Sequence, residues 1–148
     1  MSGILRIGLV GCALLKLERP APARDLYSPS ALFRWSLAYA LKHCDHAFVL
    51  SAKYGLVPLD REIEPYNQKL APGEAAAWAV NVLAALDREL PGRRLELVIL
   101  AGDTYVAPIR ERTSHLVVDP LRGIAGVPAR VKWLQAALAD AATEGAAT

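Results

Sequence analysis

Residues 95–101 read LELVILA, and this stretch decides the fold class. Its near-continuous apolar character is typical of a strand that is buried on both faces at the centre of a parallel sheet. Two similar runs, LRIGLVGC at residues 5–12 and HAFVLSA at residues 46–52, predict two more strands. Residues 115–118 predict a fourth strand.

Helical patterns separate these strands. Ser28 and Pro29 favour a helix start, and the apolar spacing then continues to about residue 43. Further helices are predicted at residues 72–90, from Gly102-Asp103 to about residue 112, and from Pro128 onward. The resulting order predicts a three-layer α/β/α fold with a mostly parallel four-stranded sheet and right-handed crossovers. We expect a single domain over residues 1–142 and a frayed tail at residues 143–148.

Composition narrows the classes of function. The chain has 148 residues, of which 53% are hydrophobic and 22% are charged, which argues against wholesale disorder. A net charge of +2 is too small to imply nucleic-acid binding by itself. The longest apolar runs are far below the ~20 residues that span a membrane, and Arg6 interrupts any signal-peptide pattern. We therefore expect a cytoplasmic protein without a membrane partner.

Motifs for metals and common cofactors are absent from the sequence. Cys12 and Cys44 do not form a metal-type pair, and there is no HExxH, GxGxxG or Walker sequence. We therefore expect no metal site and no cofactor. The oligomeric state is left open.

Polar and glycine residues follow every predicted strand. Because ligands bind beyond the carboxyl ends of the strands in open parallel sheets, these residues are candidates for one site. They are Cys12 and Lys16 after the first strand, Ser51, Lys53, Tyr54 and Gly55 after the second, Gly102, Asp103 and Tyr105 after the third, and Arg122 after the fourth.

The densest segment is LSAKYGLVPLDREIEPYNQKL at residues 50–70. Lys53 could hold a phosphate, and Tyr54 and Tyr66 could stack on a base. Glu64 could act as a general base or nucleophile, and Asn67 is a further polar candidate. Alternatively, the segment is an ordered loop whose tyrosines cover the edge of the sheet. The apolar residues after residue 52 show no sustained helical or strand periodicity, so irregular structure is expected as far as residue 71.

This segment resembles the YaaA-like proteins, and the whole chain resembles a family of small uncharacterised bacterial and phage domains related to them. The resemblance covers about residues 8–135. It depends on Gly11-Cys12 with Lys16-Leu17, on PAPARDLY at residues 20–27 with Ser30, Leu32 and Phe33, on the segment at residues 50–70, and on PLRGIAG at residues 120–126 with Trp133-Leu134.

The resemblance implies handling of nucleotides or nucleic acids, because the YaaA proteins are associated with peroxide stress and DNA binding. By analogy alone, the loop after the second strand is also similar to base-handling domains of the uracil-DNA-glycosylase type. One position departs from the family pattern: Leu14 replaces the first lysine of the N-terminal motif. If that lysine serves phosphate binding or chemistry, the activity of this chain is altered.

Two hypotheses about function follow, together with a third in which the domain serves only interaction. The first is an enzyme that cleaves or transfers an N-glycosidic bond, with Glu64 or Asp25 as the catalytic carboxylate and Cys12 as an alternative nucleophile. The second is a non-catalytic nucleic-acid-binding stress-response protein. In the first hypothesis, the base is held by Tyr27, Tyr54 and Tyr66, and the phosphate by Lys16, Lys53 and Arg122.

A geometric expectation connects the charged candidates. Lys16, Lys53, Glu64 and Arg122 should line one cleft, because each lies just after a strand end.

Overall fold

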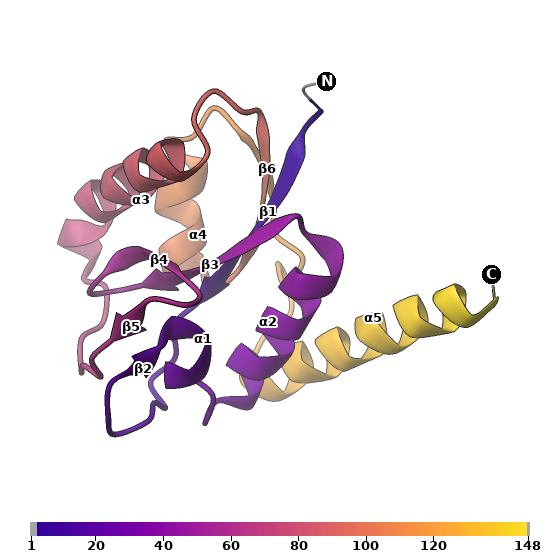
Figure 1. Cartoon of the computed structure of the whole chain (residues 1–148). Helices are drawn as coiled ribbons and strands as arrows, with labels where there is room; N and C mark the ends of the chain where they lie inside the picture. Colours follow the sequence, from indigo (N-terminus) through magenta and orange to yellow (C-terminus); the bar gives the residue numbers. More distant parts are fainter. Residues whose placement is uncertain (1–2, 148) are drawn as a thin grey trace.

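The computed structural model describes residues 3–147, with side chains described for residues 3–139. A central five-stranded sheet carries helices on both faces, which confirms the predicted three-layer α/β class, although the sheet has five strands and not four (Figure 1). The frayed tail expected at residues 143–148 lies outside the residues whose side chains are described. In chain order the elements are β1 (Leu5–Gly11), β2 (Ala21–Pro22), α1 (Ala23–Leu26), α2 (Ala31–His43), β3 (His46–Ser51), β4 (Gly55–Pro58), β5 (Glu62–Ile63), the 3₁₀ turn η1 (Pro72–Glu74), α3 (Ala75–Glu89), β6 (Leu95–Leu100), α4 (Asp103–Arg110), β7 (Leu116–Val118) and α5 (Val127–Ala147).

The strand order in the sheet is β4-β3-β1-β6-β7. The strands β3, β1, β6 and β7 are parallel, as expected from the alternation of strands and helices. The additional strand β4 runs antiparallel to β3 and lies in the segment for which the sequence predicts irregular structure. Gly55 begins β4 with a φ of +73°, a backbone conformation that glycine adopts without strain.

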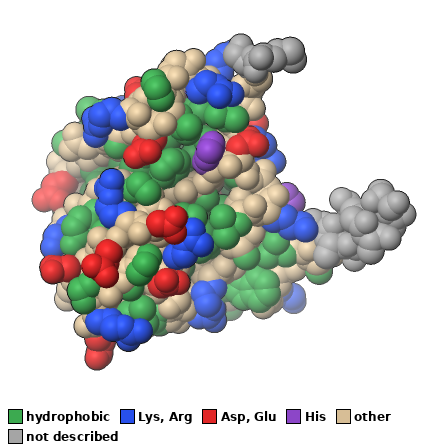
Figure 2. All heavy atoms as spheres, viewed as in Figure 1, with side chains coloured by type: hydrophobic (Ala, Val, Ile, Leu, Met, Phe, Trp, Pro, Cys, Tyr) green, Lys and Arg blue, Asp and Glu red, His purple; other side chains and the backbone are tan. Residues whose placement is uncertain are grey.

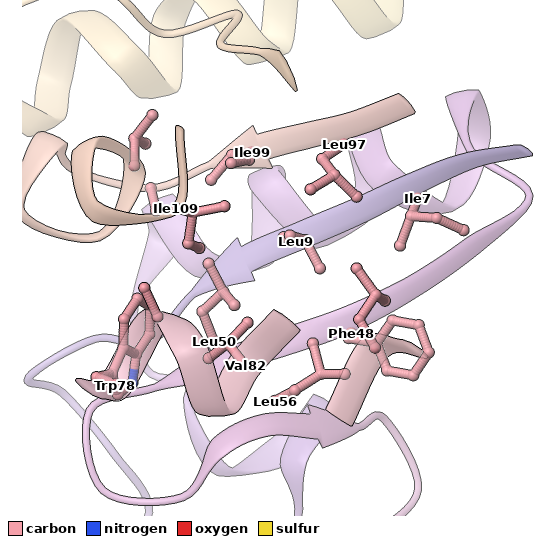
Figure 3. Packing of buried hydrophobic residues seen from close by; sticks show 14 of the residues in the cluster. Ile7, Leu9, Phe48, Leu50, Leu56, Trp78, Val82, Leu97, Ile99 and Ile109 are labelled. Carbon is pink, nitrogen blue, oxygen red and sulfur yellow. The ribbon is translucent and has the colours of Figure 1, made fainter. Parts of the chain in front are cut away.

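Side chains of the central strand β1 alternate between two hydrophobic cores. Ile7 and Leu9 belong to the core beneath α3 and α4, which also contains Val82 and Ile109 (Figure 3). Val10 belongs to the other core, which α1, α2 and α5 cover. Alternation of this kind is expected for a strand that is buried on both faces.

The cap of the helix α2 lies two residues later than predicted, at Ser30. The Ser30 Oγ, and not that of Ser28, accepts a hydrogen bond from the Phe33 N–H at 3.2 Å. This bond satisfies one of the backbone donors that a helix leaves free at its start. Because both sites are small polar residues next to Pro29, the sequence alone does not separate them.

The carboxyl ends of the four parallel strands lie where the sequence places them. β1 ends at Gly11, β3 at Ser51, β6 at Leu100 and β7 at Val118. The short strands β2 and β5 pair with each other and lie together with α1 near the end of β1 (Figure 1). Within the described residues, no helix is both long and apolar enough to cross a membrane.

Candidate functional site

The end of β1 lies very close to the end of β6. A Cβ atom on Gly11 would lie 2.8 Å from the Ala101 Cβ and 3.2 Å from the Ala101 Cα. A glycine is therefore needed for the two strands to approach this closely. The next backbone N–H, that of Cys12, still donates to the Leu50 carbonyl at 2.9 Å. Cys12 is consequently held at the edge of the sheet by its own backbone.

Ser51 organises the end of β3. Its Oγ accepts hydrogen bonds from the N–H groups of Lys53 at 3.2 Å and Tyr54 at 2.9 Å, which fixes the turn into β4. The Ser51 carbonyl accepts a bond from the Trp78 indole N–H at 2.9 Å. The Ser51 side chain is fully buried, so its hydroxyl requires these partners.

Three buried or half-buried hydroxyl groups, those of Ser51, Tyr66 and Tyr27, form a hydrogen-bonded chain. The Ser51 Oγ–H donates to the Tyr66 hydroxyl at 2.8 Å, and the hydroxyls of Tyr66 and Tyr27 lie 2.8 Å apart. Tyr54 packs edge-on against the Tyr66 ring, with 5.7 Å between the ring centroids. The chain connects α1, β3 and the loop after β5, which are distant in sequence.

Lys16 lies over this tyrosine cluster. Its Nζ is 4.7 Å from the centre of the Tyr66 ring and 5.8 Å from that of Tyr27, within the range of cation–π attraction. The same Nζ donates to the Leu14 carbonyl at 3.2 Å. An ammonium group has three N–H donors, so Lys16 retains donors for a ligand.

Cys12 lies against the first turn of α4. Its Sγ is 3.5 Å from the Tyr105 hydroxyl, and either atom can be the donor. The Tyr105 ring packs edge-on against Trp78, with 5.3 Å between centroids, which fixes the direction of its hydroxyl. The Cys12 side chain is half-buried.

These groups border two hollows. The larger one, which we call the edge pocket, has a volume of about 290 Å³. The smaller one, which we call the small cavity, has a volume of about 70 Å³ and is bordered by residues that include Arg130 and Ser36. Cys12, Ala13 and Tyr105 border both hollows. The edge pocket is lined by Cys12, Ala13, Leu14, Lys16, Gln68, Lys69, Leu70, Thr104 and Tyr105.

Burial alters the ionisation of the groups around the edge pocket. It raises the pKa of Tyr27 from 10.0 to about 12, and it raises the pKa values of Tyr66 and Tyr105 as well. These three phenols are therefore neutral near pH 7 and can donate O–H bonds. Burial also lowers the pKa of Lys16, an effect that is partly opposed by the electrostatic influence of Cys12.

The structure brings part of the predicted site together. Of the residues predicted from strand ends, Cys12, Lys16 and Tyr105 line the edge pocket, while Gly102 lines the small cavity. The predicted residues Tyr27, Ser51, Tyr54 and Tyr66 form the cluster beside them. Gly55 lies further along the same turn, whereas Asn67 and Asp103 are exposed next to the lining residues Gln68 and Thr104.

The prediction that four charged side chains line one cleft is wrong for this pocket. Lys16 lines it, but Lys53, Glu64 and Arg122 are exposed and do not. Asp25 is likewise exposed, in the first turn of α1. The topological rule brings loops to one edge of the sheet, but it does not decide which side chains turn inward. A catalytic role for Glu64 or Asp25 stays a prediction.

Six residues that line the edge pocket were not predicted as site residues, and two of them, Ala13 and Leu14, directly follow Cys12. Gln68, Lys69 and Leu70 lie at the end of the segment that dominates the motif, and Thr104 directly precedes the predicted Tyr105. Their position next to residues already singled out was the available signal. Two polar residues that line the small cavity, Arg130 and Ser36, could not be recognised from the sequence, because both lie within segments predicted as helices and not next to a predicted strand end.

Charges of both signs are mixed on the face of the molecule shown in Figure 2. Lys and Arg side chains lie among Asp and Glu side chains over α3 and the region of β2 and β5 (Figures 1 and 2). This face therefore lacks the single-sign surface that a long nucleic-acid footprint requires.

Comparison with known sequence families places the chain in one of them. The chain is a member of a family of unknown function (DUF6884), which matches residues 7–136. No curated protein and no solved structure gives a significant match to the chain. The resemblance to YaaA-like proteins stays a prediction.

Proposed function

We propose that this protein binds a nucleotide in the edge pocket, with the phosphate at Lys16. The observation that supports the proposal is the charge of the pocket at the carboxyl edge of the sheet. Both charged residues in its lining, Lys16 and Lys69, are cations, and none of the described residues that line it is acidic. A pocket of this kind favours an anionic ligand.

The uncharged lining residues support a ligand that is more than a simple anion. Leu14 and Leu70 provide apolar surface, and Tyr105 provides an aromatic ring. Gln68 and Thr104 add groups that can bond the polar edge of a base. The volume of about 290 Å³ is at the lower end of small-molecule pockets, which suits a mononucleotide and not a dinucleotide.

The carboxylate chemistry of N-glycosidic cleavage finds less support in this pocket. An oxocarbenium-like centre carries positive charge and is stabilised by a nearby carboxylate. Both candidate carboxylates, Glu64 and Asp25, are exposed and lie outside the lining. Binding is therefore the function that the geometry supports best.

Calorimetric titration tests the proposal. The wild-type protein is titrated with nucleoside monophosphates, the matching nucleosides, inorganic phosphate and a short single-stranded oligonucleotide. We expect a mononucleotide to bind. The change Lys16→Gln should raise its Kd about tenfold or more, because a charge-assisted hydrogen bond contributes roughly 1.5–3 kcal/mol.

Lys53→Gln is the matched control, because Lys53 is an exposed lysine outside the pocket. Its Kd should stay close to that of the wild type. Equal effects of the two substitutions would overturn the assignment of the phosphate to Lys16. Binding of the oligonucleotide without binding of any mononucleotide would instead favour the nucleic-acid-binding alternative.

A further inference from the structure

Cys12 holds a position in the site that binding alone does not require. It follows the central strand β1, and its half-buried thiol borders both the edge pocket and the small cavity. Its backbone N–H is fixed to the Leu50 carbonyl, and its Sγ contacts the Tyr105 hydroxyl at 3.5 Å. A nucleophilic atom is thus presented to whatever occupies the edge pocket.

The charges around this thiol determine which reactions the pocket favours. Lys16 interacts electrostatically with Cys12, and the hydroxyls of Tyr105 and Thr104 border the same pocket. Cationic and O–H groups stabilise negative charge that develops in a transition state, and they oppose positive charge. Displacement at a glycosidic carbon develops positive charge, whereas addition of a thiol to a conjugated carbonyl system develops negative charge on the carbonyl oxygen.

Among the nucleobases, pyrimidines contain such a system, in which the C5=C6 double bond is conjugated with the group at C4. We propose that Cys12 adds reversibly to C6 of the pyrimidine ring of a nucleotide bound in the edge pocket. The proposal rests on the proposed nucleotide binding and deepens it, because it names pyrimidine nucleotides as the ligand class.

The step balances without an oxidant, a reductant or a leaving group. In a uracil ring, the sulfur–C6 bond forms as the C5=C6 π bond breaks, and the displaced electron pair passes to the C4 oxygen as an enolate. The thiol proton leaves to solvent, and C5 takes up one proton. The net result is addition of S–H across the double bond, and reversal of the step restores the ring and the thiol.

The neighbouring groups match the needs of this step. Lys16 and the neutral phenol of Tyr105, whose pKa burial raises, can stabilise the enolate. The small cavity of about 70 Å³ has room for water, which occupies ~30 Å³ per molecule in the liquid and could exchange protons with C5.

Exchange of the C5 hydrogen tests the proposal. Uridine 5′-monophosphate is incubated with the protein in D₂O, and the C5–H signal is followed by proton NMR. Addition places a deuteron at C5 beside the original hydrogen, and each reversal that removes the original hydrogen leaves deuterium at C5. We expect exchange with the wild type and a fall to the buffer rate with Cys12→Ser, while Cys12→Ser still binds the nucleotide in calorimetry.

Cys44→Ser is the matched control, because Cys44 caps the end of α2, outside the lining of the edge pocket, and burial raises the pKa of its thiol. It should exchange at the wild-type rate. Cys12→Ala provides a second variant, and thermal melts confirm the folding of all three. Unchanged exchange in the two folded Cys12 variants, or no exchange by a wild-type protein that binds the nucleotide, would overturn the thiol step alone. Absence of binding to the wild type would overturn the proposed function as well.

Discussion

The hydroxyl and the ring of Tyr66 make different contacts: the hydroxyl forms hydrogen bonds, and the ring contacts Lys16. The hydroxyl receives the bond from the Ser51 Oγ and pairs with the Tyr27 hydroxyl, both at 2.8 Å. The ring lies beneath the Lys16 ammonium, 4.7 Å from its Nζ. Stability and ligand binding are therefore expected to depend on different atoms of one side chain.

Replacing Tyr66 by phenylalanine separates the two effects. Tyr66→Phe removes the hydroxyl and leaves the Ser51 hydroxyl without its acceptor, so the free energy of unfolding should fall by about 1–3 kcal/mol. Nucleotide binding should change little, because the ring that supports Lys16 remains. Tyr66→Ala should lose both, since the cation–π contact disappears too. Denaturant unfolding and calorimetric titration measure the two quantities.

Tyr54→Phe is the control for this series. Among the described residues, the Tyr54 side-chain hydroxyl makes no hydrogen bond, although its ring packs against Tyr66. Removal of the Tyr54 hydroxyl should leave the free energy of unfolding within about 0.5 kcal/mol of the wild type.

The nucleotide affinity of Tyr66→Ala decides the role of the Tyr66 ring. Tight nucleotide binding by this variant would show that the ring only covers the sheet edge.

At the residue scale, proximity to a strand end identified only part of the site, because Lys53 and Arg122 also lie within five residues of a strand end but are exposed outside the edge pocket. Cys12, Ser51 and Tyr105 come within five residues of a strand end, and all belong to the site. Glu64 was chosen for its chemistry and for its expected place after a strand end, and it too is exposed. The direction of a loop side chain depends on the packing of the whole loop, which a single sequence does not encode in a readable pattern.

At the element scale, the contact between β1 and α2 depends on a missing side chain. A Cβ on Gly8 would lie 2.7 Å from the Ala40 Cβ and 3.4 Å from the Cys44 Sγ. Ala40 is fully buried, so neither it nor the backbone of the sheet can move aside freely. The glycine sets how closely the helix approaches the central strand.

Gly8→Ala should therefore lower the free energy of unfolding by roughly 1–3 kcal/mol through overpacking. Gly73→Ala is the matched control, because nothing lies within 4 Å of the Cβ it would add. The double change Gly8→Ala with Ala40→Gly should cost less than the sum of the two single changes, since it removes the colliding atom. Denaturant unfolding of the wild type, Gly8→Ala, Ala40→Gly and the double variant gives the coupling energy between the two positions. Additive effects would mean that the helix shifts to accommodate the methyl group.

Element prediction succeeded where the elements are long. The runs that became β1, β3 and β6 each contain at least six residues, and α3 has fifteen. The strands β2 and β5 have two residues each and α1 has four, so none of them is long enough for its hydrophobic pattern to repeat. β4 was missed because Gly55 and Pro58, which suggest breaks, are the two residues at its ends.

At the scale of the whole molecule, buried phenols connect parts of the chain that are distant in sequence. Tyr27 follows α1, Tyr66 follows β5, and Tyr105 lies in α4. The Tyr27 side chain is fully buried, while those of Tyr66 and Tyr105 are half-buried. Burial disfavours the charged form of each phenol and so raises its pKa. The folded protein therefore holds these protons more tightly than the unfolded chain does.

This difference predicts a loss of stability at high pH. The pKa of Tyr27 is about 12 in the folded protein and 10.0 as the ordinary value, so its contribution is complete below pH 10 and is lost as the pH rises from 10 to 12. Two pKa units correspond to about 3 kcal/mol. The free energy of unfolding should fall by about this amount over that range, with further losses from Tyr66 and Tyr105. Denaturant unfolding at pH 8 to 12 measures the slope, and Tyr27→Phe should make it shallower because that variant has one titrating phenol fewer. A Tyr27→Phe slope equal to that of the wild type would mean that the Tyr27 hydroxyl can reach solvent without unfolding of the chain.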